Sequence, residues 1–240
     1  MDVLIACEES QRVCIEFRQL GHNAFSCDIQ KPSGGHPEWH ILDDVLKVLN
    51  PNDNGVIQFQ TMDEKQHCIK SKWDLIIAHP PCTYLSNAGA VRLYPKAGQL
   101  SRERYQLGVQ AKEFFMNFWN ADCEKICIEN PIPSRIYNLP QYSQIIQPYE
   151  YSHPYSKKTC LWLKNLPLLQ PTEIVKPICS WVSGGCKNHK GEKRINCGTT
   201  FRDSKTRSKT FSGIAKAMAE QWGGFMDAEI KKSRKEVMYK

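Results

Sequence analysis

A strand-forming run that ends at two prolines and a cysteine is the feature that most constrains how this chain can fold. Residues 73–78 are mostly apolar, and His79-Pro80-Pro81-Cys82 follows directly. Neither proline can donate to a sheet, so the chain must leave the sheet there with φ fixed at both. Cys82 is therefore predicted at the carboxyl end of a buried strand, where open α/β sheets bind ligands. A thiol there suits a nucleophile, and a buried structural cysteine is the alternative.

A second segment repeats this pattern. The apolar run 125–128 is followed by Glu129, Asn130 and then Pro131. If the two strands are neighbours, Glu129 lies at the same sheet edge as Cys82. Partial burial is expected to raise the pKa of Glu129, so that a protonated carboxyl can donate to a ring nitrogen and accept from an exocyclic amine. A solvated strand-end glutamate is the alternative, but the thiol and the carboxyl together favour a site.

These two motifs resemble those of the C5-cytosine DNA methyltransferases. Pro81-Cys82 is similar to the nucleophile loop of that family, and Glu129-Asn130 to its later Glu-Asn pair, which holds the target cytosine. The resemblance implies a Rossmann-like α/β fold dependent on S-adenosylmethionine, with a mostly parallel sheet, helices on both faces and a small irregular insert. It also implies that Cys82 attacks C6 of a cytosine flipped out of DNA, with Glu129 and Asn130 as further catalytic residues.

The resemblance covers nearly the whole chain and is closest to the short methyltransferase-like proteins of phages and prophages. Residues 3–6 are predicted to form a first strand, 11–20 a helix and 24–28 a second strand that Asp28 closes, as in ribose-binding Rossmann-like folds. Residues 40–45 resemble the motif that contacts adenine, with Asp44 preferred over Asp43. Residues 211–222 resemble a last helix that returns to the cofactor site. The cofactor-binding residues that this implies are Ala6, Cys7, Glu8, Asp28, Ile29, Asp44, Val45, His79 and Pro81.

The sequence departs from the family in three places, one of which is Pro131 where the family has valine after its Glu-Asn pair. The first loop of the family is rich in glycine, which lets the backbone approach the cofactor, but residues 6–10 contain no glycine. The arginine-rich strand of the family is replaced by residues 155–163. Lys157 or Lys158 is expected to supply the positive charge there and to lower the pKa of Cys82, although lysine is a poorer bidentate donor than arginine.

The chain is expected to divide into a core and a short insert. Residues 1–164 form the predicted catalytic core, 165–207 an insert in the place of the family's target-recognition region, 208–225 the returning helix and 226–240 a charged tail. Three thiols and one imidazole in the insert form a possible structural zinc site. Scattered reduced cysteines are the alternative, because the spacing lacks a Cys-x-x-Cys knuckle. The four proposed ligands are Cys179, Cys186, His189 and Cys197.

Composition agrees with a cytoplasmic nucleic-acid enzyme. The 240 residues carry 32 Lys and Arg against 25 Asp and Glu, a net charge of +7 that suits a polyanionic partner such as DNA. Eleven cysteines without a secretory signal indicate reduced thiols, as in the cytoplasm of a bacterium or a phage-infected cell. No apolar run approaches membrane-spanning length. The oligomeric state is left open.

Three other functions fit parts of the sequence. An enzyme that methylates exocyclic amino groups shares the two prolines but needs no thiol. An enzyme that modifies a free nucleotide would be consistent with the short recognition segment, and a non-enzymatic binder of DNA or protein with the missing glycines. Residues 86–98, which follow Cys82, either close over a flipped nucleotide or form an ordinary connection. The helix predicted over 101–120 presents four aromatic residues as core, namely Phe114, Phe115, Phe118 and Trp119.

Overall fold

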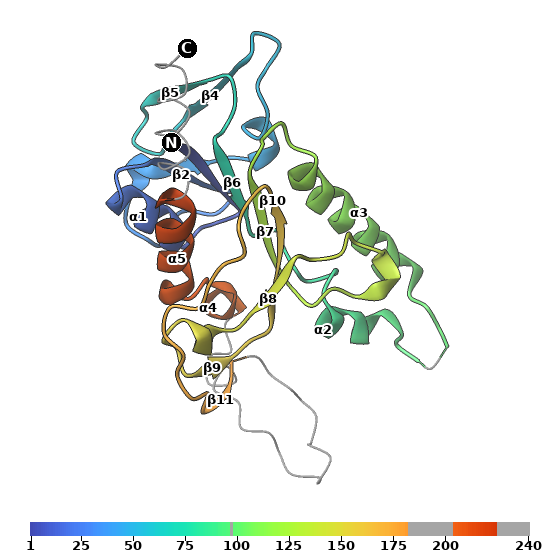
Figure 1. Cartoon of the computed structure of the whole chain (residues 1–240). Helices are drawn as coiled ribbons and strands as arrows, with labels where there is room; N and C mark the ends of the chain where they lie inside the picture. Colours follow the sequence, from blue (N-terminus) through green and yellow to red (C-terminus); the bar gives the residue numbers. More distant parts are fainter. Residues whose placement is uncertain (97, 182–203, 225–240) are drawn as a thin grey trace, which may run out of the picture.

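The computed structural model describes residues 1–96, 98–181 and 204–224, and a seven-stranded sheet lies at its centre (Figure 1). Every neighbouring pair is parallel except those of β10, which is antiparallel to both β7 and β8. The mostly parallel sheet of the predicted Rossmann-like α/β fold is confirmed, whereas the strand order and the reversed strand were not predicted. In spatial order the strands are β3 (His40–Leu42), β2 (Asn23–Asp28), β1 (Asp2–Ala6), β6 (Leu75–Ala78), β7 (Ile126–Pro131), β10 (Thr159–Lys164) and β8 (Gln144–Ile146).

The central strands are apolar along their whole length because both faces of the sheet are covered. All four residues of β6 and the last four of β1 have no exposed surface. Alternate residues of these strands point to opposite faces, so Val3 and Ile5 belong to one core cluster and Leu4 and Ala6 to the other. Parallel strands buried in this way are continuous hydrophobic runs, and such runs in the sequence predicted both strands.

Helices pack on both faces of the sheet, as predicted. Helix α1 (Arg12–Gln19) and helix α5 (Ser212–Met218) lie side by side on one face, and α3 (Arg102–Trp119) lies on the other (Figure 1). Phe115 and Phe118 of α3 are fully buried, which confirms the predicted aromatic core face. Helix α5 continues into a π-helical turn (Ala219–Gly223), in which the Trp222 ring is buried.

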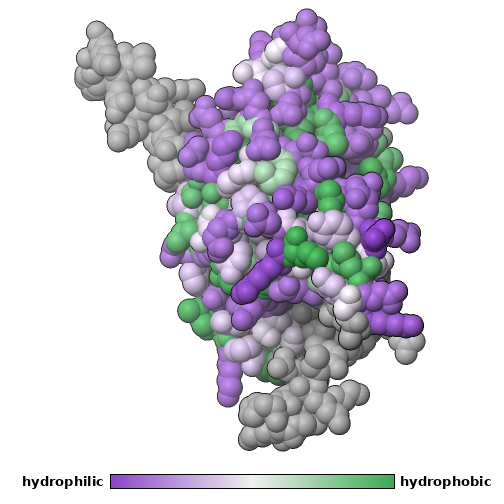
Figure 2. All heavy atoms as spheres, turned by 90° about the vertical axis from the view of Figure 1, so that its right-hand side faces the viewer, coloured by the Kyte–Doolittle hydropathy of each residue, from purple (hydrophilic) through white to green (hydrophobic). Residues whose placement is uncertain are grey.

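Short elements complete the described chain. Its surface on the α3 side is mostly hydrophilic, with apolar residues in small groups (Figure 2). Across the parts of the chain that the structure describes, no helix combines the length and the hydropathy needed to span a bilayer. The short elements are the hairpin β4 (Val56–Gln60) and β5 (Gln66–Lys70), the pair β9 (Tyr155–Ser156) and β11 (Cys179–Ser180), helices α2 (Asn87–Ala90) and α4 (Ser204–Ser208), and 3-10 turns η1 (Pro37–Trp39), η2 (Val45–Lys47), η3 (Val91–Leu93), η4 (Arg135–Tyr137) and η5 (Pro148–Glu150).

The order of strands along the chain reverses between β1 and β6. From β1 the chain builds outward to β2 and β3, whereas β6 pairs with the other side of β1 and continues to β7. In open α/β sheets ligands bind at such a reversal, beyond the carboxyl ends of the strands. The loops after β1 and β6 therefore flank the position expected for a ligand.

Candidate active site at the carboxyl edge of the sheet

Strands β1, β6 and β7 end side by side at this edge, and two hydrogen bonds fix their last residues together. The His79 N–H donates to the Ala6 carbonyl oxygen at 2.9 Å. The Asn130 amide donates to the Pro80 carbonyl oxygen at 2.9 Å, and Asn130 is 1% exposed. Asn130 therefore ties the proline turn before Cys82 to the end of β7. The condition under which Glu129 shares an edge with Cys82, that their strands are neighbours, is met because β6 and β7 are paired.

His79 and Glu129 form a nearly buried pair across these strand ends. His79 Nδ1 lies 2.9 Å from Glu129 Oε2, and the side chains are 12% and 11% exposed. Burial favours a higher pKa for Glu129, but the His79 hydrogen bond and the charges of Lys157 and His79 hold that pKa below its ordinary value. Burial opposes charging of His79, yet the hydrogen bond to Glu129 and the charges of Glu129 and Glu8 raise the pKa of His79.

The expected raised pKa of Glu129 is therefore wrong for this structure. The prediction rested on burial alone, whereas His79, directly after the neighbouring strand β6, provides an imidazole that hydrogen-bonds Glu129. His79 was expected among the cofactor-binding residues, and the structure places its Nδ1 on Glu129 instead. The geometry favours an imidazolium paired with a carboxylate.

Two buried polar atoms at this edge have no hydrogen-bond partner within the described chain. They are His79 Nε2 and Asn130 Oδ1. A buried polar atom left unpaired costs about 1–3 kcal/mol. Such atoms are accordingly the ones to which a bound ligand can add hydrogen bonds.

Cys82 lies on the same edge and is partly buried as a free thiol. Burial and the charge of Glu129 raise the pKa of Cys82, and Lys157 opposes this shift without reversing it. Of the two candidate lysines, Lys157 is thus the one whose charge reaches the thiol, while Lys158 is exposed to solvent. The expected net lowering of the thiol pKa is wrong, because one lysine does not outweigh burial and the adjacent carboxylate.

Lys157 also borders a small open pocket at the surface. Its backbone N–H donates to Gln147 Oε1 at 2.9 Å, and its ammonium group donates to the Arg207 carbonyl oxygen at 3.3 Å. These bonds hold the lysine between β9 and β10, in the segment predicted to replace the arginine-rich strand. The lining combines polar and apolar side chains. The lining residues are Glu129, Lys157, Thr159, Thr210, Phe211 and Ile214.

The loop after Cys82 is held by α3. Arg104 Nη2 donates to the carbonyl oxygens of Thr83 at 3.3 Å and Gly89 at 3.1 Å, and its guanidinium carbon lies 5.0 Å from the centre of the Tyr84 ring. A side chain at Gly89 would overlap the Thr83 carbonyl, so only glycine permits this close approach. Arg104 was not predicted as a site residue, because nothing in the sequence distinguishes it from other charged residues in the first turn of a helix.

The first loop makes its turns without glycine. Cys7 and Gln11 take the left-handed conformation, with φ of 59° and 58°. Glu8 is 3% exposed and caps helix α1, because its carboxylate oxygens accept from the N–H groups of Val13 at 2.7 Å and Cys14 at 3.2 Å. Glu8, predicted to contact the cofactor, is thus occupied by the helix, in agreement with the preference of helix N-termini for negative charge.

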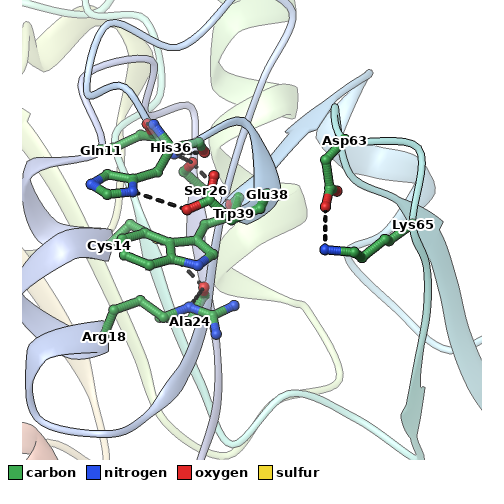
Figure 3. A network of polar contacts seen from close by, with 10 residues as sticks. All are labelled: Gln11, Cys14, Arg18, Ala24, Ser26, His36, Glu38, Trp39, Asp63 and Lys65. Carbon is green, nitrogen blue, oxygen red and sulfur yellow. Dashed lines mark hydrogen bonds and ion pairs between the residues drawn. The ribbon is translucent and has the colours of Figure 1, made fainter.

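Gln11 fastens this loop to the loop that follows β2. Its side chain donates to Ser26 Oγ at 3.2 Å and to the His36 carbonyl oxygen at 2.8 Å, and accepts from the His36 N–H at 3.1 Å (Figure 3). The His36 ring stacks on Trp39, with the ring centres 3.9 Å apart. From the sequence Gln11 is predicted only as a helix start, since its contacts connect residues 15 and 25 positions apart.

The remaining predicted cofactor residues surround the ends of β1 to β3. Burial, followed by the charges of Asp28, Cys27 and Asp44, raises the pKa of Cys7, which places both carboxylates near this thiol. Ile29 is 78% exposed, an unusual position for an apolar side chain beside Asp28. An acidic group next to an exposed apolar surface fits the ribose and the adenine of S-adenosylmethionine.

Asp43 and Asp44 both have partners within the chain. Asp43 pairs with Lys47 at 2.7 Å, and Asp44 caps the η2 turn by accepting from the Leu46 N–H at 3.0 Å. Val45 is buried at 4% exposure, so it supports the loop, and Pro81 is exposed beside Cys82. The preference for Asp44 over Asp43 stays a prediction.

The predicted zinc site cannot be assembled from the described residues. Only Cys179 belongs to them, and it is disulfide-bonded, so the predicted reduced thiol and zinc ligand at this position are both wrong. Cys186, His189 and Cys197 lie outside, as do most of the predicted insert and the charged tail. Within residues 1–96, 98–181 and 204–224, no group of three or more His, Cys, Asp or Glu side chains could hold a metal ion. Zinc held by the other three proposed ligands stays untested.

Comparison with known proteins adds little beyond this geometry. Neither a protein-family model nor a curated protein matches the sequence. A solved methyltransferase of Entamoeba histolytica is 11% identical with a TM-score of 0.40, and the match covers 77% of this chain and 60% of that one. The chain thus spans about 60% of the length of that methyltransferase. The sheet order given above assigns the fold: it is an α/β, Rossmann-like fold.

Proposed function

We propose that the chain is a DNA methyltransferase that uses S-adenosylmethionine to methylate C5 of cytosine. The observation that carries this proposal is the placement of a thiol, Cys82, and a carboxyl group, Glu129, on adjoining strand ends of a Rossmann-like sheet. Methylation at C5 needs a nucleophile for C6 and a group that exchanges a proton at N3. Transfer to an exocyclic amine needs no thiol, so the pair favours C5 chemistry.

In the proposed reaction, Cys82 Sγ forms a bond to C6 of a flipped cytosine, and loss of the C5 proton after methylation re-forms the C5=C6 bond and expels the thiolate. Glu129 binds N3 and the exocyclic amine, and Lys157 provides the positive charge that favours the thiolate. Asn130 holds the proline turn that carries Cys82. Asp28, Ile29 and Asp44 would hold S-adenosylmethionine, which supplies the methyl group when bound.

The residues that line the small pocket beside Glu129 offer contacts that suit a base. They provide a carboxylate, an ammonium group and two threonine hydroxyls, together with the apolar side chains of Phe211 and Ile214. Flipped bases are commonly read by hydrogen bonds at their edge and by apolar contacts with their faces. The net charge of +7 favours DNA as the partner that delivers the base.

Nucleoside mass spectrometry of DNA from a host without its own cytosine methylation tests the proposal. We expect 5-methylcytosine with the wild type and with Cys68→Ala, an exposed thiol on β5, but not with Cys82→Ala. N4-methylcytosine or N6-methyladenine would instead show an amino-methylating enzyme. A host genome without any modified base would contradict the proposal.

A covalent trap separates the nucleophile from a merely structural thiol. Duplex DNA with 5-fluorocytosine cannot release the enzyme after methyl transfer, so a stable adduct should form with the wild type and not with Cys82→Ala. DNA binding by Cys82→Ala should be retained. An adduct formed equally well by that variant would remove Cys82 from the reaction.

A further inference from the structure

A histidine that touches Glu129 has no role in the reaction proposed above. We propose that His79 is a positioning residue that orients Glu129 and stores the proton that Glu129 passes to N3 of cytosine. This inference rests on the proposed function. The 2.9 Å contact between His79 Nδ1 and Glu129 Oε2, inside a nearly closed environment, carries it.

The His79 ring is fixed by the chain on either side of it. Its backbone N–H is bonded to Ala6 at the end of β1, and two prolines follow. A residue before proline is restricted to extended conformations, and each proline fixes its own φ. His79 therefore presents Nδ1 to Glu129 from a rigid turn, and the same turn carries Cys82 three residues later.

Charged groups on or next to three strands face the His79 ring. Glu129 on β7 and Glu8 after β1 favour the imidazolium, and Lys157 before β10 disfavours it. Glu8 is committed to the first turn of α1, so Glu129 is the carboxylate that can exchange a proton with His79. Burial disfavours a charge on either His79 or Glu129 alone. A proton shared between the two side chains pairs them, so that both can stay buried.

The proton balance of the step is simple. The proton on His79 Nδ1 moves to Glu129 Oε2, and Glu129 then gives a proton to N3 as Cys82 Sγ bonds to C6. The C5=C6 pair becomes a C4=C5 bond, and the C4=N3 pair takes the proton. When the C4=N3 bond re-forms later in the reaction, the N3 proton returns through Glu129 to His79.

The first test needs neither DNA nor cofactor. NMR titration of histidine labelled with ¹⁵N, with the His79 signal assigned by its loss in His79→Gln, should show His79 charged above the ordinary histidine pKa of about 6.5. Glu129→Gln should lower the His79 pKa, whereas the signal of His67, on the β4–β5 hairpin, should not move. A neutral His79 in the folded wild type, or one that Glu129→Gln leaves unchanged, would overturn the inference.

The second test is the pH dependence of adduct formation on 5-fluorocytosine DNA. His79→Asn retains an N–H donor close to the place of Nδ1 but cannot store a proton. His79→Gln has its amide farther along the side chain, so it removes the donor at that place as well as the stored proton. We expect His79→Asn to slow adduct formation about 10²-fold at neutral pH and less at acid pH, where solvent can protonate Glu129. His67→Gln is the matched control, and thermal unfolding establishes that each variant is folded.

The outcomes separate the two proposals. A wild type that forms no adduct would overturn the proposed function and this inference with it. Adduct formation by the wild type with an unchanged pH profile in both His79 variants would overturn this inference alone. A loss that is equal at every pH would indicate a purely structural histidine and would also refute proton storage.

Discussion

Replacing Glu8 by alanine should destabilise the fold through helix α1. The Glu8 carboxylate accepts from the N–H groups of Val13 and Cys14, and the usual capping position, Gln11, makes no side-chain capping bond. Loss of a cap costs about 1 kcal/mol, and each buried donor left unpaired costs about 1–3 kcal/mol. Removal of a buried carboxylate offsets part of this cost, so we expect a net loss of about 3 kcal/mol.

For a chain of this length, that loss should lower the thermal midpoint by about 6–12 °C. Glu8→Gln retains one acceptor oxygen and should lose only about 1 kcal/mol. Glu16→Gln, on an intermediate-exposure position of the same helix, should stay within about 0.5 kcal/mol of the wild type. Circular dichroism melts and urea titrations measure all three variants.

The pH dependence gives a second, independent check on Glu8. Burial raises the pKa of Glu8 despite its hydrogen bonds and the nearby positive groups. A carboxyl whose pKa is higher folded than unfolded binds more protons in the folded state, so its contribution falls as pH rises from the unfolded pKa through the folded one. The stability advantage of wild type over Glu8→Gln should therefore narrow from acid to neutral pH. A Glu8→Ala variant as stable as the wild type would refute the capping argument.

Two further substitutions test the surroundings of Cys82, namely the charge of Lys157 and the packing of the loop at Gly89. Lys157→Met should raise the pKa of Cys82 further, because the lysine charge favours the thiolate. The pH needed for adduct formation should therefore move upward. Lys158→Met, at an exposed position, should leave that pH unchanged. Gly89→Ala should push against the Thr83 carbonyl, reducing adduct formation by about tenfold while the thermal midpoint moves by only a few degrees. A Gly89→Ala enzyme with normal adduct formation would mean that the loop tolerates the shift.

The sequence predicts the central strands of the sheet well, because strands that are buried on both faces must be apolar along their whole length. The runs that became β1, β6 and β7 are apolar without alternation, as central parallel strands must be. The prolines mark the ends of two of them, since Pro80 comes shortly after β6 and Pro131 is the last residue of β7. These two facts place Cys82 and Glu129 at strand ends, but they do not show that the two strands are neighbours.

The parts that could not be predicted depend on pairing between distant residues. His79 meets Glu129 only because β6 and β7 are neighbours in register, 50 residues apart in sequence. The turns at Cys7 and Gln11 are equally hidden, since glycine usually takes the left-handed conformation. Gln11 compensates through bonds to the loop at His36, which sequence spacing does not reveal.

The ionised state of Glu129 has a consequence for the order of events in the proposed reaction. Its charge is among the causes that raise the pKa of Cys82. As long as Glu129 is a carboxylate, it therefore opposes the thiolate that must attack C6. A proton moved from His79 onto Glu129 removes this opposing charge and leaves Lys157 as the charged neighbour of the thiol. Binding of a base that draws the proton toward N3 should thus activate the nucleophile in the same event, which protects the thiol from reaction before DNA is in place.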